Sequence, residues 1–174
     1  MPYKMPSPMY RDLLRGASYL LMPSLYEPFG AATEGALNGT PVVARATGGL
    51  WSQVRSLIPC PVPSFYGGAV EAGGHTADSA TGILHREQFP PHEAAEQWSR
   101  ILVSGPRERM EIPLYRGMVD AAHDALLAAS DLYRRPRDYA RIVVNAVNAL
   151  SDMHKGWEVA VEKYRGIYSV AGMH

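Results

Sequence analysis

The sequence predicts an α/β fold, a small parallel sheet with covering helices, and three observations support this. Residues 18–46 run strand, helix, strand: "SYLLM" and "PVVARA" are apolar or β-branched runs, and "AATEGALN" between them is a helical stretch that stops at Gly39. A third apolar run, "GILH" (82–85), follows a loop. From residue 91 onward, apolar residues recur at helical spacing. A strand–helix–strand unit is normally parallel, so about three parallel strands are expected. The helices should pack on this sheet and cover it.

The elements can be assigned in order along the chain. A helix at 8–16 ends at Gly16, and the continuous apolar run at 18–22 predicts a strand buried on both faces. "TGGL" (47–50) is predicted to be a tight turn that opens a helix at 51–57. The stretch 59–79, rich in Pro and Gly, is predicted to be a loop, and part of it is expected near the edge where the first strand ends. The expected later helices are 91–105, 113–133, 136–150 and 156–168. The last two, within 136–168, would close the fold.

Composition narrows the class of protein. The 174 residues are expected to form a single domain, 1–174, and 17 Lys and Arg residues balance 17 Asp and Glu residues. Without a net charge there is no long-range field to attract nucleic acid or an anionic membrane, and no apolar run reaches the roughly 20 residues that span a bilayer. The lone Cys60 and the absence of a signal-peptide pattern at the start favour a cytoplasmic location. The six histidines show no metal-ligand spacing, so no metal is expected.

The loop "PSLYEPFG" leads from the first predicted strand into a helix. In open α/β sheets, ligands bind where strands end and helices begin. The first amides of the helix have no intrahelical partners and can donate hydrogen bonds to a phosphate; they belong to Gly30, Ala31, Ala32 and Thr33. Gly30 has no side chain that would hinder the approach of the phosphate. The sequence thus predicts an anion site at this turn.

Two carboxylates flank the same turn. Glu27 and Glu34 would repel a phosphate, so their expected targets are hydroxyl groups. Phosphate beside hydroxyls describes a sugar nucleotide. The alternative is that Glu27 only favours the positive end of the helix dipole, that Glu34 is a solvated helix residue, and that "TGGL" is only a strand-to-helix turn.

The order and spacing of these motifs resemble a known family. "MPSLYEPFG" (22–30), an acidic residue in the next helix, "GTPVV" (39–43) and "TGGL" (47–50) together resemble the sugar-nucleotide-binding half of glycosyltransferases with the GT-B fold, above all the glycogen and starch synthases and their retaining relatives. The resemblance runs from about Tyr10 to Tyr168. It implies a partial Rossmann-like sheet, namely the C-terminal half of a GT-B donor domain.

The resemblance also implies roles for the two acids and the helix start. Glu27 would match the glutamate that faces the donor sugar and would be the catalytic residue, while Glu34 would hold the ribose hydroxyls. Gly30 and the amides that follow would receive the diphosphate.

The family reaction defines the remaining expectations. Thr47, Gly48 and Gly49 would lie beside the sugar and phosphate. The family moves a sugar from a nucleotide donor, such as ADP-glucose or UDP-glucose, to an acceptor hydroxyl with retention of configuration. It uses no metal or cofactor, because helix amides and basic side chains stabilise the leaving diphosphate.

The chain departs from the family in three ways. Six residues separate Glu27 from Glu34, one fewer than usual, which turns Glu34 by roughly 100° unless the turn absorbs the change. The family's phosphate-binding Arg and Lys and its N-terminal acceptor domain are absent; Arg45 is the nearest basic candidate, and it could equally be structural. The loop 59–79 is longer than the usual connection. The chain is therefore expected to be a portion of an enzyme and inactive alone.

Two other hypotheses about the function stay open. One is a non-catalytic binding or assembly module, in which the edge of the small sheet pairs with a partner chain or with a second copy. The other is a sugar-nucleotide epimerase, which shares the fold and would need acid and base residues from elsewhere.

Overall fold

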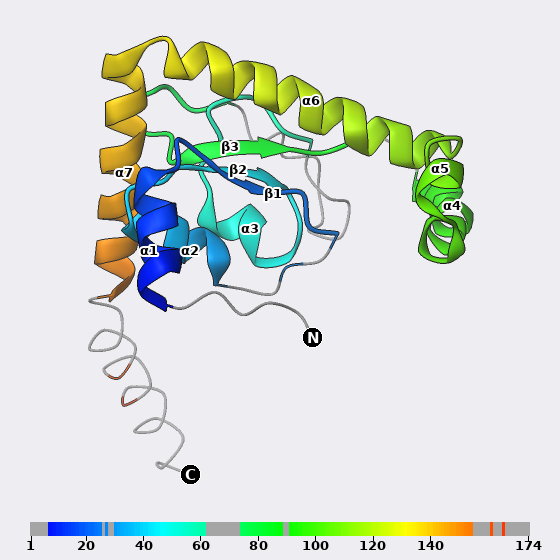
Figure 1. Ribbon diagram of the computed structural model, residues 1–174, viewed down its shortest axis with the longest axis horizontal. Coiled ribbons are helices and arrows are strands. Elements are labelled where there is room, and N and C mark those ends of the chain that lie inside the picture. The colour runs from blue at the N-terminus through cyan, green and yellow to red at the C-terminus, as the bar shows by residue number, and fades with distance from the viewer. Residues whose placement is uncertain are drawn as a thin grey trace.

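A computed structural model describes residues 7–25, 27, 30–61, 74–88, 91–154, 161 and 165. The elements in chain order are α1 (Ser7–Gly16), β1 (Leu20–Met22), α2 (Ala31–Leu37), β2 (Val42–Arg45), α3 (Gly48–Gln53), β3 (Gly82–His85), α4 (Pro91–Val103), α5 (Pro106–Arg109), α6 (Pro113–Tyr133) and α7 (Pro136–His154). Figure 1 shows the strands in the centre, with helices on both sides and an arm formed by α4, α5 and the start of α6.

The three strands form one parallel sheet in the order β1-β2-β3. Val42 of β2 pairs with Leu20 on one side and with Gly82 on the other. Because the strands are parallel and in sequence order, their carboxyl ends lie at one edge, where the loops into α2 and α3 begin. The predicted α/β fold is confirmed.

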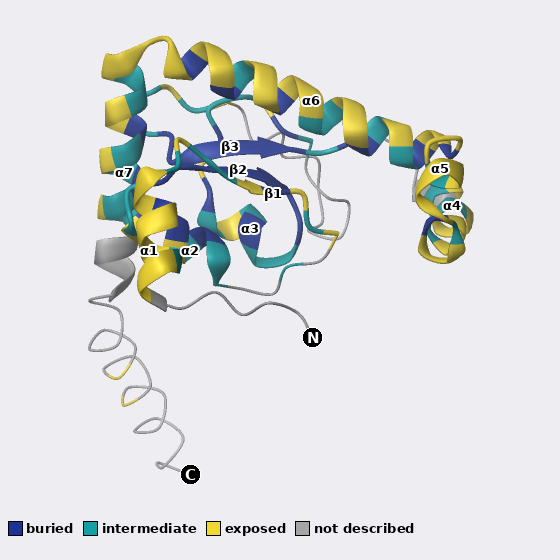
Figure 2. Ribbon diagram, in the orientation of Figure 1, coloured by how far each residue is buried: buried dark blue, intermediate teal, exposed yellow. Residues whose placement is uncertain are grey.

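Alternate residues of the sheet face two different helix layers. Ala44 and Leu84 belong to a core cluster with Ala32 of α2 and Leu50 of α3. Val43 and Ile83 belong to a second cluster with residues of α6 and α7, which include Ala125, Ala129, Leu132 and Ile142. All the residues of β2 and β3 are buried, as Figure 2 shows, so the central strands hold helices on both faces.

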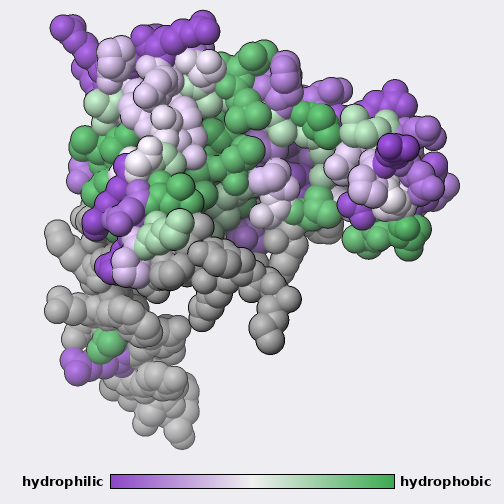
Figure 3. Space-filling view, viewed as in Figure 1, coloured by the Kyte–Doolittle hydropathy of each residue, from purple (hydrophilic) through white to green (hydrophobic). Residues whose placement is uncertain are grey.

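The first strand differs from the prediction that it is buried on both faces. In the described part of the chain β1 pairs with β2 alone, and Leu21 is 46% exposed. Figure 3 shows apolar surface in the middle of this face, where β1 lies. The continuous apolar run predicted the strand correctly. However, α6 crosses β2 and β3 and leaves β1 partly uncovered.

The helix predicted at 51–57 is present but begins and ends three or four residues earlier. α3 begins at Gly48 and ends at Gln53, because Val54 is extended and Ser56 forms a parallel bridge with Gly82. The Ser56 hydroxyl also accepts a hydrogen bond from the amide of Leu84 at 2.9 Å. A polar side chain therefore fixes the chain after α3 against β3, and the helix cannot continue.

The C-terminal part of the predicted loop 59–79, residues 74–79, lies at the amino edge of the sheet. The amide of His75 donates to the carbonyl of Ser56 at 2.8 Å, and Asn145 of α7 donates to the carbonyls of Ala77 and Ala80 at 3.0 and 3.1 Å. Residues 74–79 are therefore not the part of the stretch that was expected near the Glu27 turn. Residues 62–73 lie outside the described part.

The start of α6 forms an arm with α4 and α5, which the sequence predicted only in part. Figure 1 shows the first half of this helix extending beyond the sheet to α4 and α5. Ile101, Ile112, Leu114 and Met118 form a separate small core there. The helix predicted at 91–105 ends at Val103, and the short α5 follows Gly105. Of the closing segment 136–168, the helix predicted at 156–168 lies outside the described residues except for positions 161 and 165.

Candidate functional site

The loops after β1 and β2 are joined at the carboxyl edge of the sheet. The amide of Gly49 donates to the carbonyl of Glu27 at 2.9 Å, and the hydroxyl of Thr47 donates to the carbonyl of Leu25 at 3.1 Å. The two motifs that the sequence singled out, around Glu27 and around the "TGGL" turn, are therefore in direct contact. The hydroxyl of Thr47 is used to hold this contact.

Gly48 allows the two loops to approach so closely. Its φ is +48°, and a β-carbon placed on it would lie 2.2 Å from the carbonyl oxygen of Glu27. A backbone carbonyl cannot move aside as a flexible side chain can. No residue with a side chain fits at Gly48 without separating the loops.

The start of α2 offers backbone donors. Gly30 has a φ of 126°, and nothing lies within 4 Å of the position that its β-carbon would take. The amide of Glu34 donates to the carbonyl of Gly30 at 3.1 Å, which leaves Ala31, Ala32 and Thr33 as the first residues of the helix, whose amides have no intrahelical acceptor. Pro28 and Phe29 lie outside the described residues.

Glu34 lies beside the first helix of the chain. It is exposed, and it forms a side-chain hydrogen bond with Tyr10 of α1. Burial, followed by this bond and by the charge of Glu34, raises the pKa of Tyr10 above its ordinary value. The second carboxylate therefore lies next to α1.

Arg45, the nearest basic candidate, is structural. Its side chain is 2% exposed; Nε donates to Glu87 at 3.0 Å, a second nitrogen pairs with the other carboxylate oxygen of Glu87, and a third donates to the carbonyl of Leu25 at 3.3 Å. The guanidinium also stacks over the ring of Trp98, 5.5 Å from its centre. With its charge neutralised and its donors engaged, Arg45 holds the β1 loop and the arm to the end of β2.

No protein-family model matches the chain, and no curated protein matches it. Among solved structures it is similar to a sucrose-phosphate synthase from Thermosynechococcus elongatus, with 20% sequence identity and a TM-score of 0.48. This similarity does not establish the family. The match covers 92% of this chain and 28% of that one, so the chain spans little more than a quarter of the length of the synthase.

A cavity lies beside the loops that follow β1 and β2, between the carboxyl ends of the strands and the arm. Its volume is about 290 Å³, and its lining comes from the sheet edge and from α4, α5 and α6. Arg45 and His85 line it from β2 and β3. Sequence reasoning missed this cavity, because the residues that form it are up to a hundred positions apart.

His85 is the unexpected group in this cavity. It ends β3, where α6 covers it, and it is 4% exposed. Neither ring nitrogen has a hydrogen-bond partner in the described structure. Burial, with the charge of Arg45, lowers the pKa of His85 to about 4, and the opposing effect of Glu87 is smaller. The imidazole is therefore neutral at pH 7.

This depressed pKa predicts acid sensitivity. Between pH 6.5 and about 4 the unfolded chain binds the His85 proton and the folded chain does not, so the free energy of unfolding falls as the pH falls. The loss attributable to His85 is at most about 3 kcal/mol. We expect His85→Phe to flatten the dependence of the urea midpoint on pH between 7 and 4.5. The matched control His123→Gln, at an exposed position of α6, should keep the slope of the unmodified protein; equal slopes for both variants would contradict the assignment.

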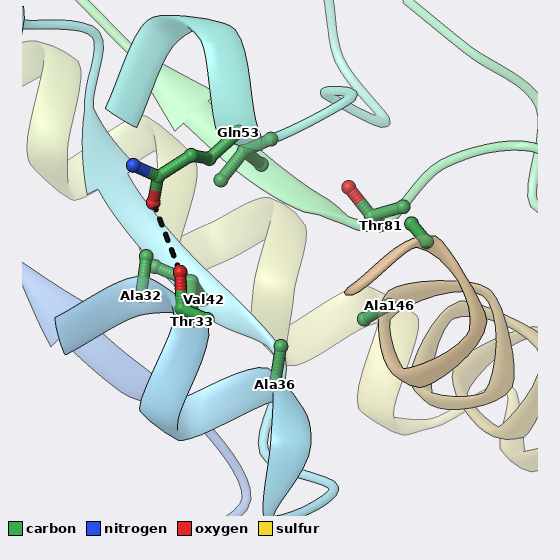
Figure 4. A pocket seen from close by; sticks show the side chains of 9 residues that line it. Ala32, Thr33, Ala36, Val42, Gln53, Thr81 and Ala146 are labelled. Carbon is green, nitrogen blue, oxygen red and sulfur yellow. Dashed lines mark hydrogen bonds between the residues drawn. The ribbon is translucent and has the colours of Figure 1, made fainter. Parts of the chain in front are cut away.

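A second cavity is too small for a ligand. It has a volume of about 10 Å³ and lies between α2, α3 and α7. Figure 4 shows Thr33 and Gln53 meeting at its wall, where their side-chain oxygens are 3.5 Å apart. The amide nitrogen of Gln53 is buried there without a partner in the described structure. A space of this size holds one water molecule at most.

Other chemistry is not favoured at the described residues. Cys60 is buried, and burial raises its pKa to about 12, so its thiol is a poor nucleophile. In the described ranges, no three His, Cys, Asp or Glu side chains come close enough to hold a metal ion. Within the same ranges, no helix is both long and apolar enough to cross a membrane.

Proposed function

We propose that the chain is the donor-binding portion of a retaining glycosyltransferase of the glycogen synthase type, which transfers a sugar from a nucleotide diphosphate sugar to a glucan or another acceptor hydroxyl. The observation that carries this proposal is the hydrogen bond between the amide of Gly49 and the carbonyl of Glu27. It joins an acid-bearing turn and a glycine turn at the sheet edge where α/β proteins bind nucleotides. The order of the motifs around both turns supports the same reading.

In this proposal the diphosphate lies at the start of α2. The amides of Ala31, Ala32 and Thr33 would donate to its oxygens, and the open space at Gly30 would admit it. Glu27 would accept hydrogen bonds from the sugar hydroxyls. Gly48 and Gly49 would line the other side without adding side-chain bulk.

Two contacts set limits on the proposal. Glu34 can reach the ribose hydroxyls only if its carboxylate leaves Tyr10, since the two side chains are hydrogen-bonded. Arg45 cannot neutralise the leaving diphosphate while it is paired with Glu87. The missing cations would have to come from another part of the complete enzyme. We therefore expect donor binding but no sugar transfer by this chain alone.

Titration of the chain with ADP-glucose and UDP-glucose, followed through backbone amide NMR signals, tests the donor site. We expect the signals of Gly30, Gly48 and Gly49 to shift at millimolar donor, with Gly16 and Gly105 as internal controls far from the turn. Glu27→Gln should weaken binding about tenfold, because a charged hydrogen-bond acceptor is lost.

The matched control is Glu96→Gln, at an exposed position of α4, which should bind as the unmodified chain does. The absence of any shift at millimolar donor, or equal weakening by both variants, would count against the donor site.

The exposed edge of β1 favours a second candidate, a non-catalytic assembly module. β1 has a free edge in the described structure, and the side chains of Leu21 and Leu25 are 46% and 41% exposed. Such an edge can pair with a strand of a partner or of a second copy. If the protein sediments as a dimer and nucleotide sugars shift no amide signal, the assembly reading is supported in place of the donor site.

A further inference from the structure

The cavity between the sheet and the arm has the form of a ligand site. Its walls are mainly apolar, with Leu25 from the β1 loop, Ile101 from α4 and Met118 from α6. Tyr115 adds an aromatic ring. Pockets that bind small molecules are typically apolar with a few placed polar groups.

The charge at the sheet side of this cavity is already paired. Arg45 lines it, but its guanidinium is paired with Glu87 and donates to the carbonyl of Leu25. Arg109 of α5 also lines the cavity, and its Nε donates to the carbonyl of Ser104 at 3.0 Å. The side of the cavity next to β2 and β3 therefore suits an uncharged group better than an ion.

His85 supplies the polar group that lacks a partner. It is 96% buried, it lines the cavity, and neither of its ring nitrogens is hydrogen-bonded within the described structure. An unpaired buried polar group costs free energy, and such groups usually have a water, an ion or a ligand as partner. A neutral imidazole has one nitrogen that donates and one that accepts.

The volume narrows the size of the ligand. An apolar cavity of about 150 Å³ accommodates benzene. The cavity here measures about 290 Å³, nearly twice as much, and fits two fused rings. None of the residues proposed for the sugar-nucleotide donor is among its described lining residues.

We propose that this cavity binds an uncharged bicyclic aromatic molecule whose ring nitrogen or N–H group forms a hydrogen bond with His85. The apolar rings would lie against Leu25, Ile101 and Met118, and the polar edge would face β3. This site goes beyond the donor site and does not depend on it, because it uses a different set of residues.

Titration with indole, compared with its isostere indene, which lacks the N–H group, tests the proposal. We expect indole to bind at millimolar concentration or better and to shift the ring signals of His85 in NMR spectra, and indene to bind more weakly. His85→Phe keeps an aromatic ring but removes the hydrogen bond, so it should abolish the preference for indole over indene.

Two neighbouring alanines of α6 provide a matched pair of variants. Ala122 lines the cavity and Ala121 does not, although both are half-buried. Ala122→Met should fill part of the cavity and weaken indole binding at least tenfold, whereas Ala121→Met should leave it within about twofold.

The outcome that overturns the proposal is equally direct. Indole that shifts no His85 signal at its solubility limit, or that binds both methionine variants equally, would exclude this site. If Ala122→Met does not fold, nuclear Overhauser contacts between indole and His85 in the unmodified chain decide the matter, and their absence excludes the site. The titration needs no nucleotide sugar, so its result is independent of the donor proposal.

Discussion

Replacing Glu87 with alanine is expected to lower the free energy of unfolding by about 3–5 kcal/mol, the range for breaking a buried ion pair from one side. Arg45 would keep its charge at a position that is 2% exposed, and it would still contact the carbonyl of Leu25 and the ring of Trp98. Neither of these carries a negative charge. The loss should appear in urea unfolding followed by circular dichroism at pH 7.

A surface ion pair provides the control for this variant. Arg141 and Asp78 are 3.1 Å apart, with side chains 59% and 74% exposed. Asp78→Ala should cost less than about 1 kcal/mol, because solvent screens exposed pairs. Similar losses for Glu87→Ala and Asp78→Ala would show that the buried pair does not hold the arm and the β1 loop to the sheet.

The second large effect is expected from Gly48→Ala. A positive φ costs a residue with a side chain about 1–3 kcal/mol, and the added β-carbon would lie 2.2 Å from the carbonyl oxygen of Glu27, so that the loops must separate. The hydrogen bond from the Gly49 amide to Glu27 would then be lost. We expect lower stability and, if the donor site is as proposed, the loss of amide shifts on addition of nucleotide sugar.

Gly16→Ala is the matched control for the change at Gly48. Nothing lies within 4 Å of the β-carbon that it adds, and its φ is not positive. Its urea midpoint should stay close to that of the unmodified chain. Gly48→Ala with an unchanged midpoint and an unchanged Gly49 amide signal would contradict the close packing of the two loops.

The sequence predicted the elements that depend on local patterns. The continuous apolar runs gave all three strands, and the helical spacing of apolar residues gave the central parts of α4, α6 and α7. Helix ends were less accurate where a distant contact decides them. α3 ends at Gln53 because Ser56 pairs with β3, a contact across about 26 residues that no local pattern reports.

Burial and ion pairing were the parts that the sequence could not supply. Leu21 looked like an interior residue, but its exposure depends on where α6 crosses the sheet. The burial of His85 at the end of β3 depends on the same crossing. Arg45 and Glu87 are 42 positions apart, and no local sequence pattern at either position predicts the ion pair. Its place at a strand end left Arg45 open between a phosphate ligand and a structural residue, and the pair with Glu87 decides for the structural role.

The candidate site divides in a similar way. The turns around Glu27 and Gly48 were identified from motif order, and the structure places them in contact. The direction of Glu34 was in doubt from the spacing alone, and the contact with Tyr10 gives its present neighbour. The cavity at His85 could not be predicted, since its walls come from segments before and after the long loop.

The stacking of Arg45 on Trp98 makes the arm optically observable. Trp98 belongs to α4, whereas Arg45 ends the central strand, so the environment of one indole chromophore depends on whether the arm rests against the sheet. With Trp51 and Trp157 replaced by phenylalanine, the fluorescence emission of Trp98 would show in real time whether the arm is packed against the sheet, without any attached dye.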